Sequence, residues 1–147
     1  QQLMEQDRER LCTFLGHERV YVLTAQTGPW VRLSDGATFD TPPLARPAVL
    51  TGIAHPHRFH RTLATLNIAA CTTHTYPDHH EFTPTEISAV LQTGGDGILT
   101  TEKDAMRLVG LKLANQPTIC YLRFRLAFAQ AGAEDSFFGQ LQSRTFL

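Results

Sequence analysis

TPTEISAVLQTGGDGILTTEKDAMRLVGL, residues 83–111, predicts a helix, a turn, a strand and a second helix in succession. Thr83 is a suitable N-cap, Pro84 fits the first helical position and Glu86 completes a capping box, so a helix is expected to begin there. The glycines of TGGDG suit the turn after a helix, and the β-branched, apolar run at 96–101 predicts a strand. This stretch is therefore typical of a fold in which helices and strands alternate.

The same alternation continues on both sides of this stretch and predicts the fold class. We expect an α/β fold, a three-layer α/β/α sandwich with a mostly parallel sheet, preceded by a helix and a short β hinge-like segment. The prolines of DTPPLARP predict a boundary between residues 1–46 and an α/β lobe of residues 47–147. The expected elements are helices at 3–16, 56–66, 83–92, 102–111 and 134–146, strands at 19–25, 48–53, 68–76, 96–101 and 118–128, and a hairpin over 29–39.

The composition is that of a globular domain and excludes several classes of protein. The chain has 147 residues, 42% of them hydrophobic, and a net charge of −1, which does not favour nucleic-acid binding. The three cysteines, Cys12, Cys71 and Cys120, have no CxxC spacing, which argues against a disulfide framework or a thiolate zinc site. No apolar run approaches the ~20 residues of a membrane span. Because the chain opens with Gln1, we expect a piece of a longer product, with a start at Met4 as the alternative.

Three polar clusters follow three predicted strands at the points where those strands end. Ligands of such sheets bind beyond the carboxyl ends of the strands, where the loops converge. The sequence therefore predicts one edge that gathers side chains from segments far apart in the chain. These side chains belong to His55, His57, Arg58, Asp78, His79, His80, Glu102, Lys103 and Asp104.

Asp78, His79 and His80 are the candidate catalytic residues. A carboxylate bonded to one imidazole nitrogen fixes the tautomer, so the other nitrogen can accept a proton. Two alternatives stay open for this cluster. The histidines could simply bond the loop backbone, or they could bind zinc together with a further ligand such as His55 or His74.

Lys103 and Arg58 are the candidate phosphate contacts. A cation in the first turn of a helix is locally unfavourable, so Lys103 is expected to meet a phosphate or a carboxylate across the cleft. Arg58 could clamp a phosphate in bidentate fashion, although a plain surface arginine is the alternative. Glu102 and Asp104 could do no more than complement the helix dipole. The chain contains no GxxxxGK[ST], GxGxxG or GxSxG motif, so a self-sufficient kinase is not expected.

Taken together, TGIAHPHRF, YPDHHEFTPTEI and ILTTEKDAMRL resemble the C-terminal half of tetraacyldisaccharide 4'-kinase, the lipid A kinase of Gram-negative bacteria, across roughly residues 47–128. That family's usual wording is close to GIANPxRF, FPDHHxF and MTEKDAVK. In this chain His55 stands where the family often has Asn, and Thr100 where it often has Met. The resemblance maps the family's Asp-His pair onto Asp78 and His79. It maps the TEKDA motif onto Thr101, Glu102, Lys103, Asp104 and Ala105 as lining of the active site.

The resemblance also implies a function, cofactors and partners. The whole enzyme transfers the γ-phosphate of ATP, with Mg²⁺, to the 4'-hydroxyl of a tetraacyldisaccharide 1-phosphate at the cytoplasmic face of the inner membrane. It has two α/β/α lobes joined by a β-stranded hinge, and its P-loop and membrane-associating helix lie upstream of the matched part. We therefore expect a soluble chain that is inactive alone and exposes a face for the missing P-loop lobe or for self-association. The alternatives are a non-catalytic α/β module that binds an anionic ligand or partner, and a metal hydrolase that uses the histidines.

Overall fold

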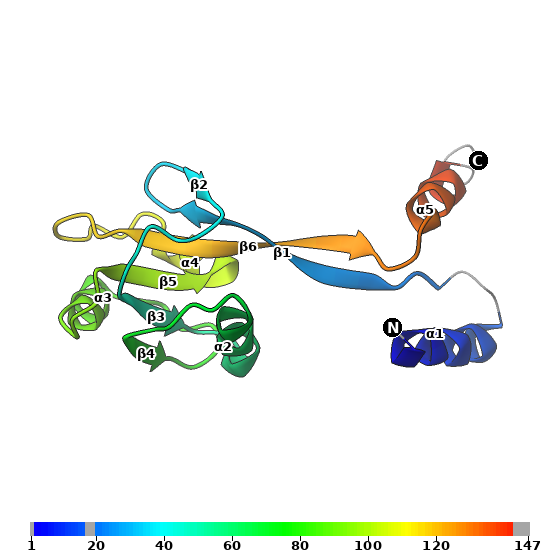
Figure 1. The fold of residues 1–147 in the computed structure, drawn as a ribbon, viewed down its shortest axis with the longest axis horizontal. Helices are drawn as coiled ribbons and strands as arrows, with labels where there is room; N and C mark the ends of the chain where they lie inside the picture. Colours follow the sequence, from blue (N-terminus) through cyan, green and yellow to red (C-terminus); the bar gives the residue numbers. More distant parts are fainter. Residues whose placement is uncertain (1, 17–19, 143–147) are drawn as a thin grey trace. The chain divides into compact units, whose positions relative to one another are not determined.

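The structure is a computed structural model that describes residues 2–16 and 20–142 (Figure 1). Helices and strands alternate through most of the chain, as the sequence predicts. In chain order the elements are α1 (Gln2–Leu15), β1 (Leu23–Arg32), β2 (Thr38–Phe39), β3 (Pro47–Thr51), α2 (Pro56–Thr65), β4 (Thr72–Thr75), α3 (Pro84–Leu91), β5 (Gly97–Thr101), α4 (Glu102–Leu108), β6 (Ile119–Phe128) and α5 (Ala133–Gln142).

The chain forms two compact units, and the long strands β1 and β6 contribute to both. The terminal unit comprises residues 1–26 and 125–147, and the sheet unit comprises residues 27–124. This division and the boundary expected between residues 46 and 47 fall at different places. The physical reason is that Trp30 and Val31 of β1 are 1% and 3% exposed in the core of the sheet unit, so residues 27–39, which precede DTPPLARP, belong to that unit.

One six-stranded sheet has the strand order β2-β1-β6-β5-β3-β4. Strands β4, β3, β5 and β6 are parallel, whereas β1 and β2 form an antiparallel hairpin with Trp30 opposite Phe39. Leu33 donates to Ile119 near the end of β1, and Ala129 donates to Val22 near its start, so β1 also runs antiparallel to β6. The predicted α/β fold with a mostly parallel sheet is confirmed, as is the hairpin.

Helices of the sheet unit cover both faces of its parallel strands, which gives the three layers. Successive residues of a strand point to opposite faces, and β3 follows this rule. Val49 packs with Phe59 and Leu63 of α2, whereas Ala48 and Leu50 pack on the other face. That second face is covered by buried residues of α3 and α4, namely Ile87, Val90 and Leu108.

Local sequence explains where the elements begin and end. The Thr83 hydroxyl accepts a hydrogen bond from the Glu86 amide, and the Glu86 carboxylate accepts one from the Thr83 amide, which confirms the predicted capping box of α3. Helix α4 ends at Leu108, short of residue 111, and Gly110 follows with φ 86°, a conformation that favours glycine.

Two predicted strands have other bounds in the structure. Strand β4 contains only residues 72–75 of the expected 68–76, because the chain turns at Asn67 with φ 56° and Ala69 and Ala70 are exposed. Strand β1 begins at Leu23 rather than residue 19 and continues to Arg32, because it pairs with β6. The end of the expected last helix, residues 143–146, lies outside the described residues, as does residue 19.

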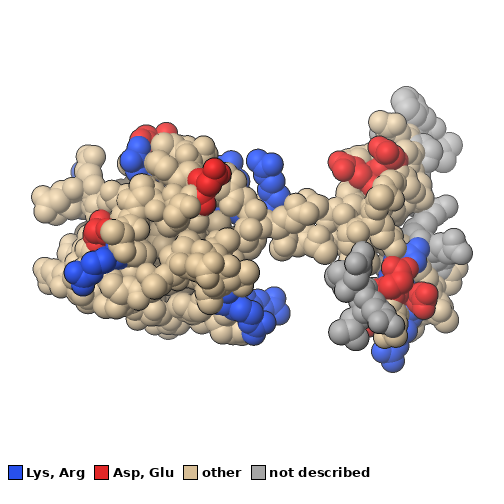
Figure 2. Space-filling view, viewed as in Figure 1, with Lys and Arg blue, Asp and Glu red and all other residues tan. Residues whose placement is uncertain are grey.

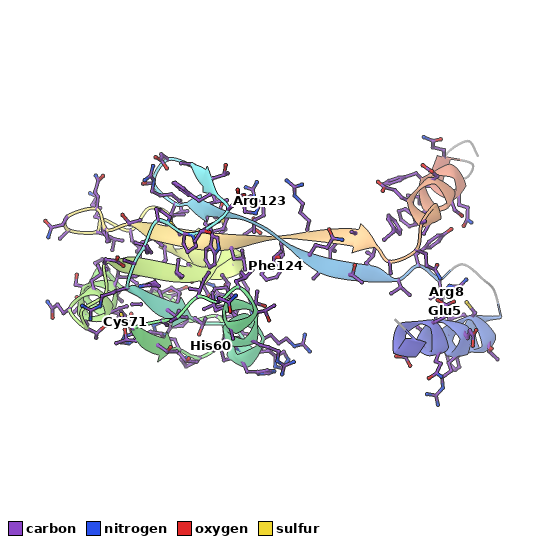
Figure 3. All side chains as sticks on the ribbon, viewed as in Figure 1. Glu5, Arg8, His60, Cys71, Arg123 and Phe124 are labelled. Carbon is purple, nitrogen blue, oxygen red and sulfur yellow. The ribbon has the colours of Figure 1, made fainter. Side chains whose placement is uncertain are left out.

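The terminal unit has its own aromatic cluster and several exposed apolar side chains. The Tyr21 ring lies 6.0 Å from Phe128 and 5.3 Å from Phe137, and the Tyr21 hydroxyl is 3.1 Å from the Ser136 hydroxyl. Helix α1 is confirmed and carries an ion pair of 3.0 Å between Arg8 and Glu5, both labelled in Figure 3. Large apolar side chains of this unit that remain 47% exposed or more are Leu11, Phe14, Leu15, Leu23, Leu126, Phe138 and Leu141.

Candidate functional site

The carboxyl ends of β3, β4 and β5 meet through direct hydrogen bonds, as the sequence predicts. The Lys103 ammonium, at the start of α4, lies 3.0 Å from Oδ1 of Asp78, which follows β4. Nη1 of Arg107, one turn further along α4, donates to the carbonyl oxygen of Gly52 after β3 at 2.8 Å. These contacts join residues 25 and 55 positions apart in the chain, so the loops that carry Gly52, Asp78 and Lys103 meet at one edge of the sheet.

A buried carboxylate, that of Asp104, binds groups from two of the loops at this edge. Asp104 is 0% exposed, and its Oδ2 accepts hydrogen bonds from the Gly52 amide at 3.0 Å and the Thr101 hydroxyl at 2.8 Å. Its Oδ1 lies 2.9 Å from Nη1 of Arg107. Both oxygens are therefore occupied within the chain, so Asp104 and the 7% exposed Thr101 hold the loops together and do not face solvent.

Gly52 is required by the close packing around this carboxylate. A Cβ at this position would lie 3.1 Å from the Phe82 ring and 3.3 Å from Oδ1 of Asp104, closer than most real Cβ contacts. The absence of a side chain lets the Gly52 amide reach Asp104 while its carbonyl reaches Arg107. The glycine at the end of β3 thus has a packing reason rather than a conformational one.

Asp78 is the carboxylate of this edge that reaches the surface. It accepts hydrogen bonds from Lys103 and from the backbone amide of His79, each at 3.0 Å. The hydrogen bond from Lys103 is the main reason that the pKa of Asp78 lies below its ordinary value, and the charges of His79 and Lys103 lower it further. Asp78 is therefore ionised at neutral pH and oriented by groups on two different loops.

His79 extends from the same loop into solvent. Its backbone has φ 63°, in the left-handed region that few residues other than glycine adopt, and its side chain is 76% exposed. Nε2 lies 3.5 Å from Oδ2 of Asp78, and Nδ1 lies 3.4 Å from Nη2 of Arg107. A strained residue with an accessible imidazole between an acid and a guanidinium is typical of a functional position.

His80 points elsewhere, although it is the next residue. Its Nε2 lies 2.9 Å from Oε1 of Glu86, its ring stacks on Tyr76 at 4.6 Å, and Phe82 packs edge-on at 5.2 Å. The pKa of Glu86 is lowered first by the amide and hydroxyl of Thr83 and then by His80. The geometry thus connects His80 with the start of α3 and gives it no bond to Lys103 or Arg107 among the described residues.

Arg58 and Glu102 are not brought into the cluster. Arg58 begins α2, on the opposite face of the sheet from α4, and its side chain forms no hydrogen bond or ion pair within the described part of the chain. Glu102 lies 3.8 Å from Arg123 of β6 and is 42% exposed. His55 and His57 contact each other, with ring centroids 5.7 Å apart.

Arg107 is the residue of this edge that the sequence analysis missed. It contacts all three segments, through Gly52, His79 and its own helix partner Asp104. The sequence does carry a signal for this residue. Asp104 and Arg107 are three positions apart on a predicted helix, and side chains at that spacing are neighbours on one face. This spacing predicts that the two side chains pair.

The described residues do not form a metal centre by themselves. Within residues 2–16 and 20–142, no three His, Cys, Asp or Glu side chains are grouped so that they could hold a metal ion. His74, a suggested zinc ligand, has its Nε2 3.5 Å from the Thr93 hydroxyl, and His55 lies against His57. The zinc alternative therefore has no supporting geometry in this part of the chain.

Charge on the sheet unit is local rather than spread over one surface. Figure 2 shows basic and acidic side chains of this unit in small separate groups on the visible face. Because the chain has a net charge of −1, its overall charge would not attract an anionic ligand. Attraction would depend on individual cations such as Lys103, which is 48% exposed.

Breaking the bond between Lys103 and Asp78 is expected to raise the pKa of Asp78 toward the usual value of about 3.9. Because this pKa is lowered in the folded chain, the stability that Asp78 contributes is present at neutral pH and is lost as the pH falls through the folded value. A ¹³C NMR titration of the Asp78 carboxyl in Lys103→Met measures the change. Lys112→Met is the matched control, since Lys112 is exposed and the ion pair with Asp78 is formed by Lys103. An unchanged Asp78 titration in Lys103→Met would show that the ion pair does not form in solution.

Comparison with known proteins assigns the chain to a family. The profile of the family described as Tetraacyldisaccharide-1-P 4'-kinase (LpxK) matches residues 2–143, nearly the whole chain. The chain belongs to this family. Membership confirms the resemblance carried by the three motifs.

Relatives from several bacteria match parts of the chain. A tetraacyldisaccharide 4'-kinase of Anaeromyxobacter sp. (strain Fw109-5) is 40% identical over 82 residues, which cover 54% of this chain and 22% of the relative. The enzyme of the same name from Chromobacterium violaceum is 44% identical over 61 residues, covering 42% and 17%. The match thus spans about a fifth of the length of these LpxK proteins.

A solved structure shows a similar fold. The crystal structure of LpxK from Aquifex aeolicus in complex with ATP matches with a TM-score of 0.58 and 20% sequence identity. The match covers 85% of this chain and 36% of that chain. The likeness supports the α/β architecture described above, and the greater part of that LpxK chain has no counterpart here.

Proposed function

We propose that this chain is the C-terminal lobe of an ATP-dependent lipid kinase, which phosphorylates the 4'-hydroxyl of a tetraacyldisaccharide 1-phosphate in lipid A biosynthesis. The observation that carries the proposal is the bond of 3.0 Å between Lys103 and Asp78, next to the exposed His79, in a chain of the LpxK family. Phosphoryl transfer depends mostly on positioning and on neutralising charge. An acid, an imidazole and a cation that are held at one edge suit that task.

The proposed roles follow from exposure and contacts. His79, with Asp78 beside it, orients the acceptor hydroxyl or takes up its proton, which needs an accessible ring nitrogen. Lys103 faces the transferred phosphate, because its ammonium is half exposed and lies next to Asp78, the neighbour of the His79 ring. Asp104 and Thr101 hold the loop that carries Lys103. The bonds of Glu102 and His80 go to Arg123 and Glu86 rather than to this cluster, so we assign them no role in the transfer.

The residues at this edge suit the phosphates of ATP but not Mg²⁺. Lys103 could contact a phosphate by sharing its bond with Asp78, so the residues fit an anionic ligand. They do not fit a Mg²⁺ site of their own, because Asp78 is paired with Lys103, Glu102 lies near Arg123 and Asp104 is buried. The metal ligands and the phosphate-binding loop of the proposed kinase therefore belong to other parts of the protein.

The terminal unit supports the proposal of a further lobe. Phe14 is 86% exposed and Leu126 is 71% exposed, and apolar surface of this kind often marks an interface. We propose the P-loop lobe as the partner that covers it, with self-association of the isolated chain as the consequence when that lobe is absent. No described helix combines the length and apolar character needed to cross a bilayer. We propose the cytoplasmic face of the inner membrane as the site of action of the whole enzyme.

The test compares the 147-residue chain with the product of the natural open reading frame that contains it. The chain alone is expected to transfer no phosphate from ATP to tetraacyldisaccharide 1-phosphate, because it holds no GxxxxGK[ST] sequence. The complete product is expected to transfer it. Transfer by the chain alone would refute the dependence on a P-loop. A complete product with neither a P-loop nor activity would favour the non-catalytic binding module.

A further inference from the structure

Arg107 of α4 has polar contacts with Gly52, Asp104 and His79. Its Nη1 lies 2.8 Å from the Gly52 carbonyl oxygen and 2.9 Å from Oδ1 of Asp104, and its Nη2 lies 3.4 Å from Nδ1 of His79. The side chain is only 19% exposed, and Asp104 is fully buried. The guanidinium is therefore fixed by two bonds on its inner side, while its outer nitrogen faces the imidazole.

The chemistry of arginine decides what this outer nitrogen can do. A guanidinium has only donors and stays protonated in proteins, so Arg107 can donate to Nδ1 of His79 but cannot accept from it. The neutral imidazole in this contact must carry its hydrogen on Nε2. Nε2 lies on the side of Asp78, 3.5 Å from Oδ2, so a hydrogen on Nε2 lies near a carboxylate.

Little else restrains the His79 ring. The side chain is 76% exposed, and within the described part of the chain its polar contacts are those with Arg107 and Asp78. The His79 backbone has φ 63°, in the left-handed region. The orientation of an otherwise free imidazole thus depends on two charged neighbours, one from its own loop and one from α4.

We propose that Arg107 is a positioning residue that holds His79 as the Nε2–H tautomer, with Nε2 toward Asp78. Asp104 and Gly52 fix the guanidinium, and the guanidinium fixes the ring. The inference deepens the proposed function, because it keeps the hydrogen on Nε2 and leaves Nδ1 as the nitrogen that can accept a proton. The acceptor hydroxyl would replace the 3.4 Å contact with Arg107 at Nδ1 when it hands over its proton. The family wording given above has Lys at the position of Arg107, and an ammonium is likewise a donor without acceptors, so Lys is the conservative replacement.

The test reads the tautomer directly and needs no activity. Long-range ¹H–¹⁵N NMR spectra of the ¹⁵N-labelled chain at about pH 8.5, two units above the ordinary pKa of imidazole, give the shifts of both ring nitrogens of each histidine. We expect Nδ1 of His79 to be more completely unprotonated than Nδ1 of His57, an exposed histidine of the same chain. Arg107→Lys should keep this difference, Arg107→Met should abolish it, and Arg123→Met is the matched control that should leave it unchanged.

Two results would overturn the proposal: a wild-type His79 with the same nitrogen shifts as His57, or a difference that persists in Arg107→Met. If Arg107→Met does not fold, the comparison of His79 with His57 in the wild-type chain and in Arg107→Lys decides. In the complete kinase, Arg107→Met is expected to lower kcat by about 100-fold with little change in the KM for ATP. Because the NMR result concerns the chain alone, an inactive kinase with the expected shifts would fault the proposed function and leave the positioning intact.

Discussion

Replacing His79 by alanine is expected to lower the turnover of the complete kinase by about 10²–10⁴-fold, the usual contribution of a positioned acid or base. The expected cause is loss of the ring nitrogen that handles the proton of the acceptor hydroxyl. The fold should be unaffected, because the side chain is 76% exposed and packs against little else. Steady-state transfer from ATP to tetraacyldisaccharide 1-phosphate, measured beside thermal unfolding, separates the two effects.

His80→Ala is the matched control, since it removes an imidazole from the adjacent position. The His80 ring stacks on Tyr76 and packs against Phe82, so its loss is expected to lower the free energy of unfolding by about 1 kcal/mol. Turnover of the folded fraction should change far less than in His79→Ala. The opposite ranking, with His80 essential and His79 dispensable, would contradict the assignment, and full activity of both variants would remove the histidines from the mechanism.

The second large effect is expected from Asp104→Ala, which should lower the free energy of unfolding by about 3–5 kcal/mol. The carboxylate is fully buried and satisfies the Gly52 amide, the Thr101 hydroxyl and Arg107, so its removal leaves these donors without their partner. A loss of this size is a large share of the ~5–15 kcal/mol that stabilises a typical domain. Urea unfolding followed by circular dichroism measures it.

Glu102→Ala serves as the control for the same helix turn. Glu102 is 42% exposed and lies 3.8 Å from Arg123, so its loss is expected to cost less than about 1 kcal/mol. Equal destabilisation by the two substitutions would mean that Asp104 acts only through the helix dipole. That result would remove the buried network from the account.

The parts of the fold that were predictable from sequence are those governed by local rules. The capping box at Thr83 and Glu86 fixes the start of α3 through bonds between residues three positions apart. The hairpin over residues 29–39 depends on local turn chemistry. The extent of β1 was not predictable, because pairing with β6, about a hundred residues later, decides it.

The candidate site shows the same distinction. The strand-end rule correctly gathered Asp78 and Lys103, because the carboxyl ends of parallel strands lie at one edge. The burial of Asp104 could not be foreseen, since an acid in the first turn of a helix is usually exposed and its partner Gly52 is 52 positions away. The side chains of His79 and His80 point in different directions because the His79 backbone is left-handed. The local sequence does not predict that backbone conformation.

The most direct test of the central claim is a crystal structure of the complete kinase with a non-hydrolysable ATP analogue. The account predicts that the γ-phosphate lies at the edge formed by β3, β4 and β5. Lys103 should be within about 3 Å of a phosphate oxygen, and the His79 ring should face the position of the acceptor hydroxyl. Phosphates bound at a different face, with the Asp78–His79–Lys103 cluster open to solvent, would contradict it.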